Sequence, residues 1–191
     1  ALTTKDFSGL LLPLPSLPTA PRKLTTPALK SLVVSAGGGI VIGGGSVTTT
    51  GTQTYDNNLL LANNAHATLL KAINAPITFT GTVNNQAGGA AQSLTVDAGT
   101  GAVMFSEAIG DQGAIGDLVV KSAGVTGVTT FTKAVDAASL TTDSGGTVVI
   151  KGGRITTSGA QSYGEDLILD NSGNATLLKA INAPITFTGT V

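Results

Sequence analysis

The 17-residue stretch ATLLKAINAPITFTGTV at residues 67–83 occurs a second time, without a change, at residues 175–191. Around it, residues 31–83 align on residues 139–191 without a gap, at an offset of 108 residues. Unrelated segments do not match in this way, so the chain contains a tandem repeat, a feature that decides the fold before any other. The sequence therefore predicts one repeat domain over residues 31–191.

A shorter period runs inside this repeat. Strand-like runs that begin with leucine start at Leu32, Leu59, Leu94, Leu118, Leu140 and Leu167. Phe79, Phe105 and Phe131 follow one another at a constant spacing of 26 residues, and their alternation with small or polar neighbours places the rings on one face. Stacking leucine on leucine and phenylalanine on phenylalanine predicts an all-β fold, a right-handed parallel β-helix (β-solenoid) of about six coils. A two-sheet sandwich would suit short strands, but it does not explain the constant spacing.

The first thirty residues differ from the rest of the chain, because they hold five of its seven prolines. Proline fixes φ and lacks an N–H donor, so such a stretch is extended and lies outside a central sheet. We expect residues 1–30 to form a Pro-rich extended arm, a cap or a linker.

Composition excludes several classes of function. The chain has 191 residues, with 10 Lys and Arg against 11 Asp and Glu, so it offers no basic face for nucleic acid and no polybasic membrane patch. It has no Cys and one His, which excludes a zinc site, a disulfide framework and a cysteine nucleophile. Its longest uncharged stretches are rich in Gly, Thr, Asn and Pro, so no segment is expected to form a transmembrane helix. We expect no metal and no cofactor.

Candidate catalytic groups are few. His66 has Asn174 as its counterpart in the second copy, which favours a turn residue over a catalyst. Paired carboxylates could act as acid and base, as in β-helices that cleave polysaccharides. The candidates for such a pair are Glu107, Asp111, Asp117, Asp136 and Asp143. Glu165 replaces Asn57 of the first copy, so that acid is not kept between the copies. We expect solvated or turn-forming acids, and not an enzyme.

Threonines flank the phenylalanines and predict an outward surface ladder. Its members are Thr78, Thr80, Thr130, Thr132, Thr186 and Thr188. Flat Thr-x-Thr arrays on β-solenoids resemble those of several ice-binding proteins, although Met104 and Ser106 interrupt this one. Threonine also favours strands and pairs well along a sheet, which explains the same pattern without a ligand.

The coil pattern also resembles a known group of proteins. The pattern S/D-L-x-V-x-x-x-G followed by V-x-F occurs as SLTVDAGTGAVMFSEAIG at residues 93–110 and as DLVVKSAGVTGVTTFTKAV at residues 117–135. Related stretches are GGSVTTTGTQTYDNNLLL at residues 44–61 and GGRITTSGAQSYGEDLIL at residues 152–169. These coils resemble the shaft repeats of filamentous-haemagglutinin-like adhesins and other β-strand-repeat surface proteins of Gram-negative bacteria. The resemblance implies export to the bacterial cell surface and a rod that displays or anchors rather than catalyses.

The last coil is expected to be open, because Val191 corresponds to Val83, after which the first copy continues into another coil. Unpaired strand edges invite another chain to pair with them. The residues predicted for such an assembly end are Ile185, Phe187 and Val191, with Leu11 and Leu12 of the Pro-rich arm.

The function that we expect is a secreted, non-enzymatic structural or adhesive shaft. It would self-associate head to tail into fibres or belong to a longer array, and it could meet a glycan or a host-surface receptor. Two alternatives stay open: a polysaccharide-binding or polysaccharide-cleaving β-helix, and a Thr-array ice-binding protein.

Overall fold

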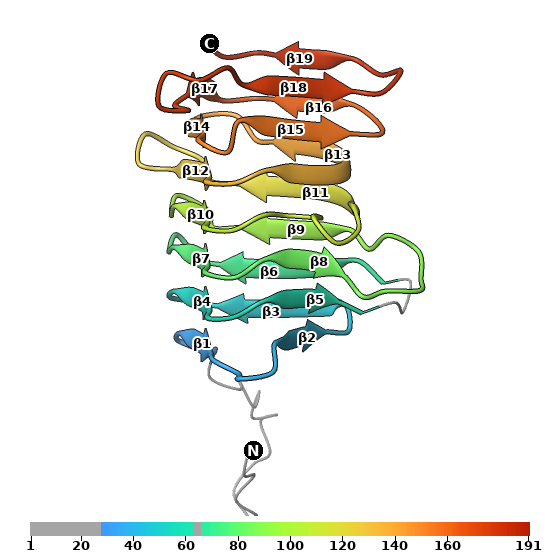
Figure 1. Cartoon of the computed structure of the whole chain (residues 1–191). Coiled ribbons are helices and arrows are strands. Elements are labelled where there is room, and N and C mark those ends of the chain that lie inside the picture. The colour runs from blue at the N-terminus through green and yellow to red at the C-terminus, as the bar shows by residue number, and fades with distance from the viewer. Residues whose placement is uncertain (1–27, 63–65) are drawn as a thin grey trace, which may run out of the picture.

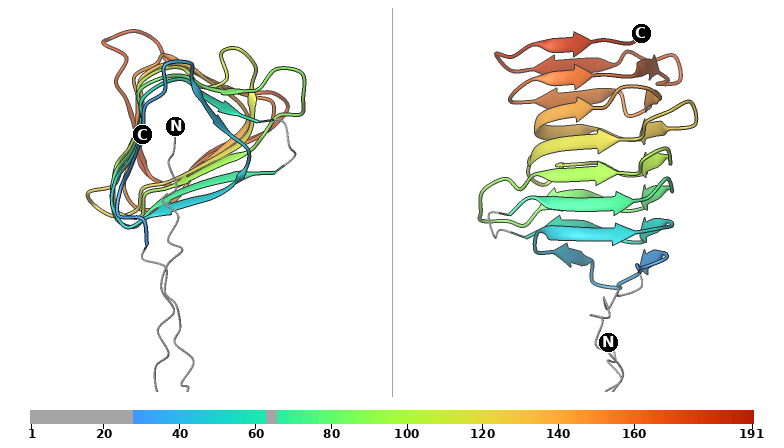
Figure 2. Two further views of the ribbon diagram at one scale, coloured as in Figure 1. Left: turned by 90° about the horizontal axis from the view of Figure 1, so that it is seen from below. Right: turned by 180° about the vertical axis from the view of Figure 1, so that it is seen from behind.

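The described chain forms a rod of stacked parallel strands. The computed structural model describes residues 28–62 and 66–191. Figure 1 shows the strands lying in successive layers from the N-terminal to the C-terminal end, and the view along the rod in Figure 2 shows a three-sided cross-section. All regular elements among the described residues are strands, and every strand pair is parallel. The predicted all-β parallel β-solenoid is confirmed. None of these residues belongs to a helix that could span a membrane.

The strands of successive turns lie on three faces, which we number in the order in which the chain visits them. The first face holds β1 (Leu32–Val34), β4 (Gln53–Tyr55), β7 (Ile77–Phe79), β10 (Val103–Phe105), β12 (Val128–Phe131), β14 (Thr147–Ile150) and β17 (Asp166–Leu169). The second face holds β2 (Ile40–Ile42), β5 (Leu59–Leu61), β8 (Val83–Asn85), the start of β13 (Val135–Thr142), β15 (Arg154–Thr157) and β18 (Leu177–Ala180). The third face holds β3 (Gly45–Thr49), β6 (Thr68–Ala72), β9 (Leu94–Asp97), β11 (Ile115–Lys121), the end of β13, β16 (Gln161–Tyr163) and β19 (Ile185–Phe187). Isolated bridges at Ile109 connect β8 to β13 on the second face.

The rod has about seven turns, and not the six that the leucine-led runs suggest. Leu94, Leu118 and Leu140 do pair with one another on the third face. The other three runs lie elsewhere: Leu59 is on the second face, whereas Leu32 and Leu167 are on the first face. Leucine therefore does not mark one fixed position per turn. Polar residues such as Gln53 and Thr129 fill the matching place in other turns.

The 108-residue repeat is not a whole number of turns. Leu32 lies on the first face, whereas its counterpart Leu140 pairs with Leu118 on the third face. In the same way Tyr55 lies on the first face and its counterpart Tyr163 on the third. The second copy of the sequence is thus turned by one face about the rod axis relative to the first copy. Matching segments form matching strands, but they present their outer side chains in different directions.

Aromatic rings form the centre of the core on the first face. Phe79, Phe105 and Phe131 are in register with one another, as their constant spacing predicts. Tyr55 stacks on Phe79 with centroids 5.1 Å apart, and the next two stacking distances are 4.7 and 5.3 Å. These four side chains are at most 1% exposed. The ladder continues as an aliphatic one, because Phe131 pairs with Ile150.

A buried polar network accompanies each tyrosine. The Tyr55 hydroxyl donates to Gln53 Oε1 at 2.9 Å, and Gln53 Nε2 donates to Lys71 O at 2.7 Å and to Thr49 Oγ1 at 3.2 Å. The second copy repeats every bond with Thr157, Gln161, Tyr163 and Lys179 in the corresponding roles. Burial raises the pKa of both tyrosine hydroxyls, so both stay protonated donors. Buried polar groups are tolerated when such partners exist, and the network joins strands of neighbouring turns.

An asparagine bends the chain at matching corners of the two copies: Asn74 lies between the third and first faces, and Asn182 lies between the second and third faces. Asn74 and Asn182 occupy the same place in the two copies and have φ of 54° and 56°, a left-handed conformation that asparagine accepts more readily than most residues. In the next turn the backbone comes very close, since a Cβ on Gly101 would clash with the backbone carbonyl group of Ala75. Local sequence thus determines both the bend and the tight approach of successive turns.

Candidate functional site

The last turn of the described rod, β17 to β19, presents an apolar end. β19 pairs with β16 on one edge, and its other edge has no partner within the described chain. Phe187 is 40% exposed and Val191 is 72% exposed, while Ile185 is partly buried. The three C-terminal residues predicted for an assembly end therefore lie together at one end of the rod. The other two, Leu11 and Leu12, lie outside the described residues, as does nearly all of the predicted arm.

The six predicted surface threonines do not form one row. Thr78 and Thr130 both pair with Met104 on the first face, so they belong to one ladder. Thr186 pairs with Ser162 on the third face and points to another side of the rod. Thr80, Thr132 and Thr188 each follow a strand at a corner. The structure separates the third threonine pair from the other two because the second copy is turned by one face.

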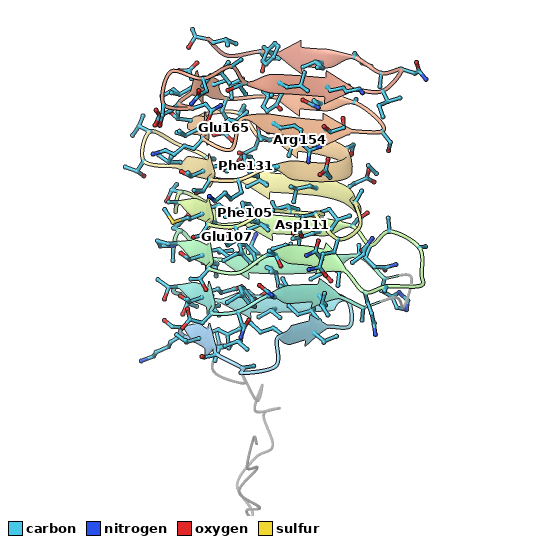
Figure 3. The ribbon with its side chains drawn as sticks, in the orientation of Figure 1. Phe105, Glu107, Asp111, Phe131, Arg154 and Glu165 are labelled. Carbon is cyan, nitrogen blue, oxygen red and sulfur yellow. The ribbon has the colours of Figure 1, made fainter. Side chains whose placement is uncertain are left out.

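The five predicted acidic candidates are spread along the rod. Glu107 and Asp111 lie in the middle turns, and both are exposed (Figure 3). Asp111 accepts a hydrogen bond from Asn84 Nδ2 at 2.8 Å. Asp117 accepts one from the Ser139 hydroxyl at 2.6 Å. Both bonds connect side chains of neighbouring turns.

Asp136 is held by a cation from the following turn. Its two carboxylate oxygens accept hydrogen bonds of 2.7 and 2.6 Å from the two terminal nitrogens of Arg154. This two-point pair joins β13 to β15 on the surface of the second face. The fifth candidate, Asp143, accepts from the Ser122 N–H at 3.1 Å. His66 is exposed.

A shallow depression lies at the corner between the first and second faces. It has a volume of about 330 Å³. Its lining consists mostly of glycines and of the amide side chains of Asn57, Asn58, Asn84 and Gln112. Asn58 Oδ1 accepts from the Thr82 N–H, and Asn84 Oδ1 accepts from the Gln112 N–H. The side-chain amides of Asn58 and Asn84 therefore link neighbouring turns.

Glu165 is the acidic residue that sequence reasoning did not select. It lies between β16 and β17, nearer the C-terminal end of the rod (Figure 3), and its side chain is 2% exposed. Neither of its carboxylate oxygens has a hydrogen-bond partner of acceptable geometry. Burial, followed by the charge and proximity of Asp143, raises its pKa to about 8. Its difference from Asn57 in the first copy was visible in the sequence, but its burial was not.

Comparison with known proteins finds no matching family model, no matching curated protein and no matching solved structure.

Proposed function

We propose that this chain is a secreted, non-enzymatic structural or adhesive shaft at a bacterial cell surface, in which β-solenoid turns stack end to end. The observation that carries the proposal is the in-register stacking of parallel turns, in which each turn covers the strand edges and core rings of the one before it. Phe79 is fully buried in the middle of the rod, whereas Phe187, in the same sequence, is 40% exposed at its end. The coil pattern that resembles adhesin shafts supports the location at the cell surface.

The rod itself indicates what fits on the exposed end. In the middle of the rod, Ile77 N–H donates to Ala102 O at 3.0 Å, and Phe79 O accepts from Ser106 N–H at 3.0 Å. The following phenylalanine ring, Phe105, stacks on Phe79 at 4.7 Å. The identical groups of β19 face outward at the end of the rod. A further solenoid turn supplies the missing strand edge and the missing apolar cover together.

A second copy of this chain, or a further turn of a longer repeat array, supplies such a turn. Each copy carries about seven turns of matching strand spacing, so its first turn can continue the three faces of the preceding rod. The net charge of –1 leaves little long-range repulsion between copies. A shaft built in this way displays its lateral faces at regular intervals, which suits adhesion to a glycan or a host-surface receptor.

Sedimentation velocity over a concentration series tests the stacking. We expect the purified chain to form oligomers that grow with concentration, and electron microscopy to show rods of increasing length. Phe187→Lys or Val191→Lys places a charge on the exposed end and should leave monomers. Val125→Lys is the matched control, because Val125 is fully exposed on a lateral loop, and it should assemble as the wild type does.

Two results would overturn the proposal. One is a wild-type chain that stays monomeric at all concentrations while the amides of β19 exchange as slowly as those of β7. The other is assembly that survives both end variants with their folds intact, as judged by circular dichroism.

A further inference from the structure

A cluster of oxygen atoms lies at the corner between the third and first faces, independent of the exposed end. Three successive turns meet there: residues 122–127 between β11 and β12, residues 143–146 between β13 and β14, and Glu165 between β16 and β17. We call this the oxygen corner. Ser122, Gly127 and Glu165 are buried in it, and Asp143 is partly buried.

The oxygens converge on a point beside Gly146. An ideal Cβ on Gly146 would lie 2.7 Å from Ser122 O, 2.9 Å from Gly127 O and 2.9 Å from Glu165 Oε2. Gly146 has φ of 140°, a conformation that side chains rarely adopt, so glycine is favoured here twice over. Its missing side chain is what allows a carboxylate and two carbonyls from different turns to approach one another.

The two carboxyl groups of this corner form no ion pair among the described residues. The three ion pairs of the described residues are Lys71–Asp97, Lys151–Asp170 and Arg154–Asp136, and none includes Glu165 or Asp143. Both Glu165 oxygens are buried without a hydrogen-bond partner. Asp143 contributes a second carboxylate, of which Oδ1 already accepts from the Ser122 N–H. A buried carboxylate without partners carries a large desolvation cost, which a bound cation removes.

We propose that the oxygen corner binds one calcium ion through the carboxylates of Glu165 and Asp143 and the carbonyl oxygens of Ser122 and Gly127. Calcium takes oxygen ligands of this mixed kind in irregular geometry, whereas magnesium demands a near-ideal octahedron. Among the described residues, no three Asp, Glu, His or Cys side chains lie close enough together to hold a metal ion. The two backbone carbonyls are therefore essential to this set of ligands. The ion would tie three successive turns together at one edge of the rod.

The first copy offers a natural comparison for this site. The counterpart of Glu165 is Asn57, whose Nδ2 donates to Ala36 O. This side chain therefore has a hydrogen-bond partner without a bound ion. Glu165→Asn therefore gives the second copy the residue that the first copy has at the matching position, Asn57. Glu165→Gln keeps the size of the side chain and removes its charge.

Thermal unfolding and calorimetric titration with calcium chloride, after treatment with a chelator, test the proposal. We expect one ion per chain and a rise in the wild-type Tm of about 5 °C or more at a calcium concentration 100-fold above Kd. Glu165→Gln and Glu165→Asn should abolish both signals. Asp170→Asn, which removes an exposed carboxylate paired with Lys151, should keep them.

The proposal fails if calcium does not raise the wild-type Tm, or if Glu165→Gln binds calcium as well as the wild type does. A magnesium titration gives a further criterion. Equal or larger shifts with magnesium would contradict the assignment to an irregular calcium site. These outcomes do not depend on head-to-tail stacking, since Phe187→Lys monomers can be titrated in the same way.

Discussion

Residues 67–83 and residues 175–191 have the same sequence but different surroundings. Both bend at a left-handed asparagine, and both place a phenylalanine over a tyrosine ring, at 5.1 and 5.3 Å. In the first copy the phenylalanine and the final valine are 0 and 1% exposed, against 40 and 72% in the second. Local conformation is therefore a property of the sequence, whereas burial is a property of the turn that lies next to it.

The two copies also differ in direction. The first segment runs over the third and first faces as β6 and β7, and the second over the second and third faces as β18 and β19. Identical outer side chains thus point to different sides of the rod. A repeat of this kind distributes a surface feature around the shaft and does not build it into one flat array.

The largest effect should come from removing the two matching phenylalanines. Phe79→Ala deletes a fully buried ring between two stacked neighbours and should reduce the free energy of unfolding by about 3–5 kcal/mol. Phe187→Ala, measured on monomers, should cost about 1 kcal/mol, since the ring has one stacked neighbour and is partly exposed. Denaturant unfolding of both variants measures the difference. Equal losses would contradict the contrast in burial.

The second effect concerns Glu165 and its counterpart Asn57, and it is measured in buffer with a chelator. Because the pKa of Glu165 is raised from 4.5 to about 8, the folded state holds a proton that the unfolded state has released between these values. The stability present below pH 4.5 should therefore decline as the pH rises toward 8, by an amount on the order of a few kcal/mol. Glu165→Gln should remove this decline. A wild-type stability that rises over the same range, with the variant unchanged, would contradict it.

The third effect should be the same in both copies. Gln53→Leu and Gln161→Leu each leave a buried tyrosine hydroxyl without its acceptor, which should cost about 1–3 kcal/mol. Both glutamines are fully buried although Gln161 lies near the end of the rod. Thermal unfolding of the two variants should give closely similar shifts in Tm. A much smaller shift for Gln161→Leu would mean that the position along the rod matters more than the network does.

The smallest effect concerns the matching lysines. Lys71 donates to Asp97 at 2.7 Å, while Lys179 is exposed and belongs to no ion pair of the described residues. Burial raises the pKa of Asp97, but hydrogen bonds from Lys71 and Gly99 and nearby positive charges lower it by more. Lys71→Ala should cost about 0.5 kcal/mol at low salt, and Lys179→Ala nothing measurable. Repeating the unfolding in 1 M salt should remove the difference.

Much of the fold could be predicted from the sequence. The constant spacing of Phe79, Phe105 and Phe131 predicts three stacked turns, and the structure confirms this. The number of turns was harder to predict, because Leu32 and Leu140 are equivalent in the sequence repeat but lie on different faces. A spacing identifies neighbours where turns have equal length. It fails where turns shorten, as between Thr129 and Val148, which pair directly.

The candidate sites were less predictable. The exposure of Phe187 could not be predicted from its own strand, since the identical strand around Phe79 is buried. Glu165 could be recognised as a difference between copies, but its lack of a partner depends on Ser122, Gly127 and Gly146 from two other turns. No local pattern contains those residues together.

The sequence by itself determines the strands, the left-handed bends and the order of apolar and polar side chains, because these depend on residues a few positions apart. The tertiary structure alone decides which face each strand occupies, which side chains are buried, and that two carboxylates meet two carbonyls at the oxygen corner. The physical reason is that these properties depend on the accumulated length of all preceding turns. Turns of different length stack in register, since Phe105 pairs with Phe131 after 26 residues and Phe131 pairs with Ile150 after 19, so residue spacing alone does not give the face of a later segment.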